Sequence, residues 1–279
     1  MLVFDTQSTM HAWSSAQHVE SRRIGLVPTM GALHRGHVTL IREAQRLCEV
    51  VVVSIFVNPL QFNRREDFDH YPRPAADDLE LCSSLGVAAV YAPTDDTMYP
   101  AGFDTHIEVG QLADTLEGAG RPGHFRGVAT VVAKLFNAVR AQVAVFGEKD
   151  FQQLMIISRM VFDLDMAITI VSVPTERESD GLAISSRNGR LSPRQRDAAT
   201  VVPNALAATR KAFESGERNS RILCEMAAQV VALEQLARLE YVDIVDPLTL
   251  RGIDPVQPGA RVVIAVWFGD IRLIDNIAI

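Results

Sequence analysis

Cysteine is scarce in this sequence, and the scarcity excludes two classes of protein. Only Cys48, Cys82 and Cys224 occur among 279 residues, which is too few and too scattered for a disulfide framework or a clustered zinc site. We therefore expect reduced, packed thiols, as in cytoplasmic proteins, and no protein-bound metal.

Long hydrophobic runs and an excess of positive charge are also absent. The longest apolar runs, residues 50–57 and 262–268, have the length of strands and not of membrane spans, and residues 1–13 lack the features of a secretory signal. The net charge of -7, from 27 basic and 34 acidic residues, argues against a protein that coats nucleic acid. The sequence predicts a soluble, cytoplasmic protein that binds small molecules, with no nucleic-acid or membrane partner.

Short apolar segments alternate with segments of helical periodicity over the first two thirds of the chain. The predicted strands are 24–27, 50–57, 87–91, 143–146 and 168–173. The predicted helices between them are 36–48, 75–84, 128–140 and 151–164. This βαβα order predicts a Rossmann-like α/β fold, an open parallel sheet with helices on both faces, in which ligands bind beyond the carboxyl ends of the strands.

The pattern changes after about Leu182. Ser192-Pro193 is a strong helix start, and an Ala-rich helix with a kink at Pro203 should follow. A further helix over 220–236 and two strands, 239–245 and 261–268, predict a small antiparallel sheet. We therefore divide the chain into an N-terminal domain, 1–182, and a C-terminal α+β domain, 183–279.

The most informative motif follows the first of these strands and opens the first of these helices. It contains His34-Arg35-Gly36-His37, which puts two imidazoles on one side of a helical turn at a helix N-terminus suited to a phosphate. With seven histidines and 17 glycines in 279 residues, chance predicts roughly 0.01 such tetrapeptides. The alternative is a pair of surface histidines at a helix start.

Three further segments carry polar groups at strand ends or in loops. Lys149, in Gly147-Glu148-Lys149-Asp150, would present a cation to a polyphosphate, although Asp150 and Gln153 also fit a capping pair. The loop 180–188 contains Ser185-Ser186-Arg187, which can wrap a triphosphate, although such loops are common. Asn58 and Gln61 offer amides to a small substrate, or are solvated groups in a Pro-induced loop.

Taken together, these elements closely resemble the pantoate–β-alanine ligase family of the nucleotidyltransferase superfamily. The match covers nearly the whole chain and includes the segments Val27-Pro28-Thr29-Met30-Gly31, Tyr71-Pro72-Arg73, Arg121-Pro122-Gly123-His124-Phe125, Gly147-Glu148-Lys149-Asp150 and 177–188. The H-x-G-H motif alone is shared across the superfamily, whereas the combination is specific to this family.

The resemblance implies a two-step ligase that uses ATP as co-substrate, with Mg²⁺. Pantoate attacks the α-phosphorus to give pantoyl adenylate and pyrophosphate, and β-alanine then attacks the acyl carbon to give pantothenate and AMP. The resemblance also implies a homodimer formed through the N-terminal domain. The C-terminal domain should close over the site, because an acyl adenylate is labile in water.

The family match also assigns site residues. The implied ATP site comprises Met30, Gly31, Ala32, Leu33, His34, Arg35, Gly36, His37, Gly147, Glu148, Lys149, Asp150, Glu176, Ile184, Ser185, Ser186 and Arg187. His37 carries the family's proton-donor role, and His34, Lys149 and Arg187 should stabilise charge beside it. Gln61 and Gln153 are the implied pantoate ligands, with Asn58 in support and His124 at the border of the pocket.

Three positions depart from the family pattern. Asn63-Arg64-Arg65 replaces a common Gly-Pro-Asn, which leaves the conformation of that loop open. Glu176 stands where Val is common, so its ATP contact should come from the backbone. Asp77-Asp78 resembles a metal-binding carboxylate pair of some members, but Leu81 replaces the polar third partner. We therefore expect Mg²⁺ to be held mainly by the phosphates.

Three other functions use some of the same features. A simple adenylyltransferase would share the histidine motif without an amine-acceptor site. A class I aminoacyl-tRNA synthetase or related RNA-binding module is disfavoured by the length and the acidic balance. A non-catalytic ATP-binding scaffold would leave Lys149 and the segment 185–187 without a purpose.

Overall fold

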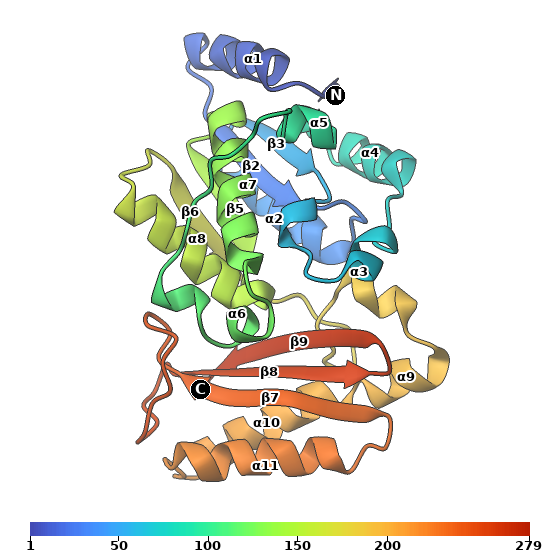
Figure 1. Ribbon diagram of the computed structural model, residues 1–279, viewed down its shortest axis with the longest axis vertical. Coiled ribbons are helices and arrows are strands. Elements are labelled where there is room, and N and C mark those ends of the chain that lie inside the picture. Colours follow the sequence, from blue (N-terminus) through green and yellow to red (C-terminus); the bar gives the residue numbers. More distant parts are fainter. The chain divides into compact units, whose positions relative to one another are not determined.

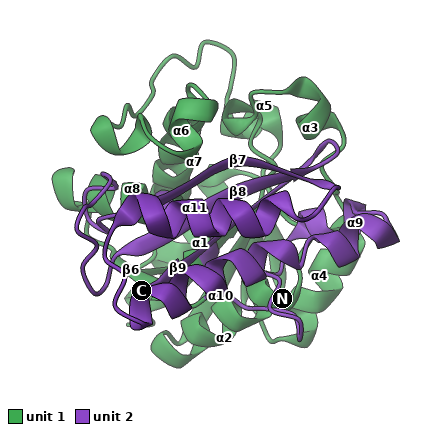
Figure 2. Ribbon diagram, turned by 90° about the horizontal axis from the view of Figure 1, so that it is seen from below, with its two compact units in different colours: residues 1–148, 153–174 green, residues 149–152, 175–279 purple.

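The computed structural model describes all 279 residues, which form two compact units. Unit 1 comprises residues 1–148 and 153–174, and unit 2 comprises residues 149–152 and 175–279 (Figure 2). No helix of the protein has both the length and the apolar character needed to cross a bilayer.

Unit 1 is built on a six-stranded, fully parallel sheet with the order β1-β4-β3-β2-β5-β6 (Figure 1). The strands are β1 (Leu2–Phe4), β2 (Ile24–Thr29), β3 (Val50–Ile55), β4 (Ala89–Tyr91), β5 (Val143–Gly147) and β6 (Thr169–Val173). The buried strands are runs of valine, isoleucine and leucine because helices cover the sheet.

The helices of this part of the chain cover both faces of the sheet. The α-helices are α1 (Gln7–Val19), α2 (Arg35–Leu47), α3 (Arg65–Asp69), α4 (Ala75–Ser84), α5 (Asp95–Met98), α6 (Glu117–Gly120), α7 (His124–Val139) and α8 (Phe151–Asp163). The 3-10 turns are η1 (Pro59–Gln61), η2 (Gln111–Ala113) and η3 (Glu148–Asp150). α2 and α4 bury Ile41, Ala44 and Cys82 against alternate residues of the strands, and α7 packs on α1 and β2.

The strand order has a topological switch point between β2 and β5. The chain leaves β2 through α2 to β3 on one side, whereas it leaves β5 through α8 to β6 on the other side. β2 and β5 are hydrogen-bonded neighbours, so the loops after Thr29 and Gly147 diverge at one edge of the sheet. Open α/β sheets bind ligands in the crevice at such a point.

Unit 2 contains a three-stranded antiparallel sheet in the order β7-β8-β9 with two long helices. Its elements are η4 (Ser186–Arg190), α9 (Pro193–Ala198), α10 (Val201–Glu214), α11 (Ser220–Ala232), β7 (Ala237–Val245), β8 (Arg261–Phe268) and β9 (Ile271–Ala278). Its core joins α10 and α11 to the sheet through buried residues such as Leu206, Leu223 and Ile264.

The α/β fold class, with the parallel sheet and the antiparallel C-terminal sheet, is confirmed. The kink expected at Pro203 is a break at Ala199 and Thr200, between α9 and α10. A proline cannot donate to the carbonyl four residues earlier and its ring crowds that carbonyl, which here belongs to Ala199. The expected strands at 24–27 and 143–146 each extend further, to Thr29 and Gly147.

The segment 175–182, which we assigned to the N-terminal domain, lies in unit 2. It forms a hairpin in which Arg177 and Ala183 are paired antiparallel. Arg177 also donates to both carboxylate oxygens of Asp275 in β9, at 2.6 and 2.9 Å. These contacts, made with a residue far along the chain, attach the segment to the C-terminal sheet.

Candidate active site

The loop after β2 has a conformation that its sequence supports. Gly31 has φ +83°, and a Cβ there would lie 2.9 Å from Asp78 Oδ2, so glycine is required. The Gly31 N–H donates to Thr29 Oγ1 (3.1 Å), and Thr29 Oγ1 donates to the Ser54 carbonyl in β3 (2.6 Å). Ala32 also has a positive φ, +50°. The chain thus turns sharply from β2 into α2.

Asp78 of α4 holds this turn in place. Its side chain is buried, with 2% of the residue exposed, and its two oxygens accept the Ala32 N–H (2.8 Å) and the Leu33 N–H (2.7 Å). A buried carboxylate with both oxygens engaged by the backbone is a positioning group. From the sequence, Asp78 is a candidate metal ligand only, and its positioning role was not predicted because it depends on contacts with a loop 45 residues away.

His34 and His37 lie together at the start of α2. His34 is the N-cap residue, and its N–H donates to His37 Nδ1 at 3.2 Å. The ring centroids are 4.1 Å apart. The bond to Nδ1 fixes the His37 ring so that its other nitrogen, Nε2, is the one that can carry a proton to a ligand. The predicted proximity of the two imidazoles is confirmed, whereas their role in catalysis stays a prediction.

Asn58 and Gln61 belong to one buried network after β3. Asn58 Nδ2 donates to Gln61 Oε1 (3.0 Å) and to the Gly127 carbonyl (3.1 Å). Asn58 Oδ1 accepts from the Leu60 N–H and from the Tyr99 hydroxyl, at 3.3 and 2.7 Å. Both amide hydrogens and both lone pairs of Asn58 are therefore used inside the protein. This favours a positioning role for Asn58 over direct contact with a substrate.

Gln61 joins this network to the loop after β2. Its Nε2 lies 3.2 Å from Met30 Sδ, so the side chain ends beside the predicted ATP loop. The Gln61 carbonyl accepts from His124 Nδ1 at 2.7 Å and from the Arg121 guanidinium at 3.1 Å. His124 is buried and acts here as a holder of η1. The structure thus brings Met30, Gln61, Asn58 and His124 together within unit 1.

Two residues that support this network were not identified from the sequence. A Cβ at Gly127 would collide with the backbone carbonyl of Leu60, so this glycine lets α7 pack against η1. Burial raises the pKa of Tyr99 far above its usual range, which keeps its hydroxyl protonated as the donor to Asn58. Neither residue lies in a motif, so only the packing reveals them.

Beyond the end of β5, Gly147 and Glu148 belong to unit 1, and Lys149 and Asp150 belong to unit 2. The Lys149 side chain is 19% exposed, and its Nζ lies 3.5 Å from Asp150 Oδ1. The Lys149 carbonyl accepts from Asn276 Nδ2 of β9 at 2.9 Å. The backbone of the candidate phosphate-binding lysine is therefore fixed to the C-terminal sheet.

Gln153, the second implied pantoate ligand, is half-buried. Neither the amide nor the carbonyl group of its side chain forms a hydrogen bond within the protein. The alternative interpretation as the partner of Asp150 in a capping box required such a bond. The absence of that bond leaves the amide available to a ligand.

The remaining predicted residues lie in unit 2, in the hairpin and the turn that follows it. The Glu176 carbonyl accepts the Ile184 N–H at 3.0 Å, so the backbone of one predicted ATP residue is paired with that of another. Ser185 caps η4 by accepting the Arg187 N–H at 3.3 Å, and this turn contains Ser186 and Arg187.

The turn of the hairpin is held by an ion pair. Asp180 Oδ2 lies 2.7 Å from the Arg196 guanidinium, and this hydrogen bond lowers the pKa of Asp180 below its ordinary value. Asn188 Nδ2 donates to the Ala183 carbonyl at 3.0 Å. The segment 176–188 is thus a fixed loop of unit 2, in spite of its loop-like composition.

No group of three or more histidine, cysteine, aspartate or glutamate side chains in the protein is arranged to hold a metal ion. Taken together, the fold and the loop after β2 define a doubly wound α/β enzyme whose candidate site lies at the carboxyl edge of the sheet, next to the switch point.

Comparison with known proteins identifies the family. The sequence profile described as Pantoate-beta-alanine ligase matches residues 2–278. The pantothenate synthetase of Heliobacterium modesticaldum is 48% identical over 279 residues, covering 100% of this chain and 99% of the relative. Pantothenate synthetase 1 of Bradyrhizobium diazoefficiens is 51% identical over 259 residues, covering 92% and 91%.

Solved structures agree. The pantothenate synthetase of Thermus thermophilus superposes with a TM-score of 0.94 at 43% identity and covers 100% of this chain and 99% of its own. The pantoate-beta-alanine ligase of Francisella tularensis, complexed with beta-gamma ATP and beta-alanine, gives a TM-score of 0.82 at 33% identity and covers 100% and 97%. The chain therefore belongs to the pantoate-beta-alanine ligase family, as the resemblance implied.

Proposed function

We propose that this protein condenses pantoate with β-alanine and uses ATP, through a pantoyl-adenylate intermediate. The pantoate carboxylate attacks the α-phosphorus of ATP and pyrophosphate leaves. The β-alanine amine then attacks the acyl carbon, and AMP leaves. The observation that carries the proposal is the contact between Gln61 and Met30, because it places a candidate pantoate ligand beside the candidate ATP loop.

The loop after β2 is the proposed nucleotide site. Met30–His37 lead into the N-terminus of α2, whose dipole favours phosphate, and they carry two imidazoles beside it. His37 is the proposed proton donor, with its ring held through Nδ1 by the His34 N–H. Gln61 and Gln153 are the proposed pantoate ligands, and Asn58 and His124 hold Gln61 in place.

The family resemblance adds four residues of the C-terminal part of the chain to the proposed ATP-binding residues. Lys149, Ser185, Ser186 and Arg187 would stabilise the charge that develops on the departing pyrophosphate. A carboxylate is a poor nucleophile toward an anionic phosphate, so positioning, which can contribute about 7–11 kcal/mol, and charge stabilisation must do most of the catalysis. We propose that the C-terminal domain acts as a lid that excludes water from the adenylate.

Mg²⁺ would accompany ATP on its phosphates. Asp78, the family position that could offer a carboxylate to the metal, uses both oxygens to accept backbone N–H groups, and Leu81 offers no ligand. These two positions therefore do not fit a metal site.

The proposal is tested by isotope exchange. With ATP, pantoate and Mg²⁺ but without β-alanine, the enzyme should exchange labelled pyrophosphate into ATP. Lys149→Ala should reduce the exchange by about 10²–10³, the loss expected when one donor to a developing charge is removed. Lys211→Ala, at an exposed position of α10, is the matched control and should leave the exchange unchanged. An absolute requirement for β-alanine in the exchange would show that no free adenylate step exists.

The substrate assignments have a separate test. Gln61→Ala and Gln153→Ala should raise the KM for pantoate at least tenfold and change the KM for ATP much less. Gln45→Ala, an exposed glutamine of α2, is the control. If the variants only lower the melting temperature and leave KM unchanged, both glutamines are structural.

We further propose a cytoplasmic homodimer, as the family resemblance implies. Unit 1 offers an open sheet edge at β6 and the exposed apolar side chains of Phe162 and Leu164, features that are covered by a second subunit in many dimers. Light scattering coupled to size-exclusion chromatography measures the mass directly. A mass of one chain at micromolar concentration would contradict the dimer.

A further inference from the structure

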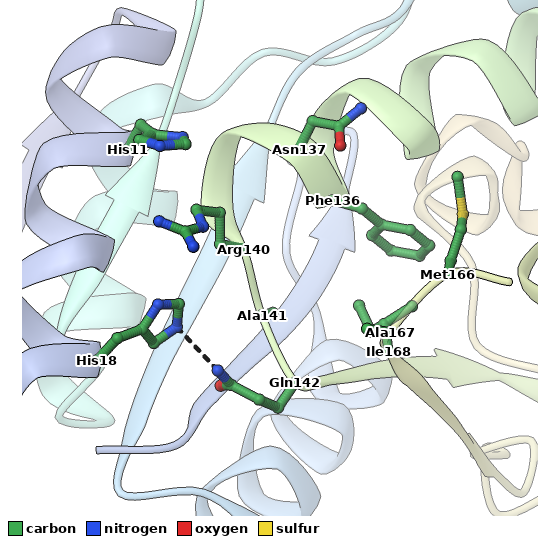
Figure 3. A pocket seen from close by; sticks show the side chains of 10 residues that line it. All are labelled: His11, His18, Phe136, Asn137, Arg140, Ala141, Gln142, Met166, Ala167 and Ile168. Carbon is green, nitrogen blue, oxygen red and sulfur yellow. Dashed lines mark hydrogen bonds between the residues drawn. The ribbon is translucent and has the colours of Figure 1, made fainter. Parts of the chain in front are cut away.

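A pocket lies in unit 1 at the amino edge of the sheet, before the first residues of β5 and β6. Its volume is about 470 Å³, within the range of small-molecule sites. The lining residues are His11, His18, Phe136, Asn137, Arg140, Ala141, Gln142, Met166, Ala167 and Ile168 (Figure 3). None of them belongs to the proposed active site.

The pocket contains positive charge and no negative charge. Arg140 is positively charged, and no lining residue is acidic. The Arg140 guanidinium donates to Ser15 Oγ at 3.1 Å and forms no ion pair with a carboxylate. In a chain whose net charge is -7, an arginine without a counter-ion in a pocket is a place where an anion gains charge-assisted hydrogen bonds.

The histidines add directed polar groups. Figure 3 shows both imidazoles pointing from α1 toward the segment 140–142. His18 Nε2 lies 2.8 Å from Gln142 Nε2, whose amide oxygen accepts the Ile24 N–H at 2.7 Å. His11 Nδ1 is buried and has no hydrogen-bond partner. An unpaired buried nitrogen is costly unless a ligand or a water completes it.

The opposite wall is apolar. Phe136, Met166 and Ile168 line it, and Figure 3 shows Phe136 and Met166 across the pocket from the histidines. A ligand that satisfies both walls carries its charge at one end and an apolar body at the other.

We propose that this pocket binds a small organic anion, a carboxylate or a phosphate attached to an apolar body, at a site separate from the adenylation site. The separation follows from the sheet, because parallel strands present one edge to the substrates and the other edge to this pocket. Binding of the anion therefore does not compete with ATP or pantoate.

The test uses phenyl phosphate and benzoate as anionic probes and phenol as the neutral probe of similar shape. The protein is titrated in a buffer free of phosphate, with the active site filled by a non-hydrolysable ATP analogue and pantoate. The readout is the proton NMR signals of the imidazole rings of His11 and His18, assigned with His11→Gln and His18→Gln. We expect saturable shifts of both signals with either anion and none with phenol.

Arg140→Gln should weaken the binding of both anions at least tenfold. Arg221→Gln removes an exposed arginine of α11 and, as the matched control, should change it less than twofold. Because Arg140 has φ +53°, Arg140→Asn is the second variant, since asparagine tolerates this conformation. Both variants should retain AMP formation, which shows that they fold.

Three results would overturn the proposal. The first is the absence of saturable shifts with both anions, and the second is equal binding by the wild type and both Arg140 variants. The third is binding of phenol as tight as that of phenyl phosphate, which would show an apolar cleft without anion recognition. A difference between benzoate and phenyl phosphate alone would identify the preferred charged group.

Discussion

Replacement of Asp78 by asparagine should damage the adenylation loop without touching a substrate. The carboxylate accepts the Ala32 N–H and the Leu33 N–H at 2.8 and 2.7 Å. Asparagine has one acceptor oxygen, and its NH₂ group would face one of these N–H donors. One buried N–H group is then left without a partner, and the remaining hydrogen bond loses its charge assistance.

The size of the effect follows from these two bonds. A hydrogen bond to a charged group contributes about 1.5–3 kcal/mol, and a buried unsatisfied donor costs about 1–3 kcal/mol. We expect the free energy of unfolding to fall by about 2–4 kcal/mol. Ala32, at φ +50°, is held in a conformation that costs roughly 1–2 kcal/mol, so the loop should relax once it is released.

Relaxation of the loop moves the start of α2 and with it His34 and His37. A displacement of about 1 Å at a catalytic group can cost about 10²-fold in rate, so kcat should fall by about 10- to 100-fold. The assay is steady-state AMP formation, combined with urea denaturation and with a titration of Mg²⁺. A positioning role leaves the Mg²⁺ concentration for half-maximal activity unchanged.

Asp77→Asn is the matched control, since Asp77 is the exposed neighbour on the same helix and its substitution removes the same charge. It should keep nearly full stability and activity. The reasoning would be refuted if the two variants behaved alike. It would also be refuted if Asp78→Asn raised only the requirement for Mg²⁺, because that result would identify a metal ligand.

Three further predictions rest on single observations. His34→Ala and His37→Ala should each lower kcat by about 10²–10⁴, whereas exposed His106→Ala should not; near-wild-type rates for the first two would exclude the proposed site. Gly127→Ala should lower the free energy of unfolding by about 1–3 kcal/mol and raise the KM for pantoate, because the added methyl group would displace η1. Unchanged urea unfolding and unchanged pantoate kinetics would disprove this packing. Burial raises the pKa of Cys82 to about 11, so at pH 8 the group stays a neutral thiol and should react with Ellman's reagent only after unfolding; rapid reaction of the native protein would contradict its burial.

The sequence was sufficient where structure depends on local pattern. Predominantly apolar runs such as Val50–Ile55 are typical of strands in a covered parallel sheet. The H-x-G-H motif follows such a strand and lies at the start of the next helix. The interruption near Pro203 was also predictable, since proline removes a donor wherever it occurs. The position of the break was less predictable, because it lies at Ala199, four residues before the proline, whose ring crowds the Ala199 carbonyl.

Other features depend on residues that are distant in the chain. Asp78 could be a metal ligand or a positioning group, and only its contacts with Ala32 and Leu33 distinguish the two. The attachment of residues 175–182 to unit 2 depends on the ion pair between Arg177 and Asp275, which no local pattern indicates.

The sequence by itself determined the fold class, the family and the motifs, because periodicity and the order of residues along a strand or turn encode them. Only the tertiary structure decided which polar groups are already satisfied and which remain available. Asn58 uses all its hydrogen-bonding groups within the protein, whereas His11 Nδ1 has no partner. The physical reason is that a hydrogen bond is satisfied by distance and direction in space, and segments far apart in the sequence supply those partners.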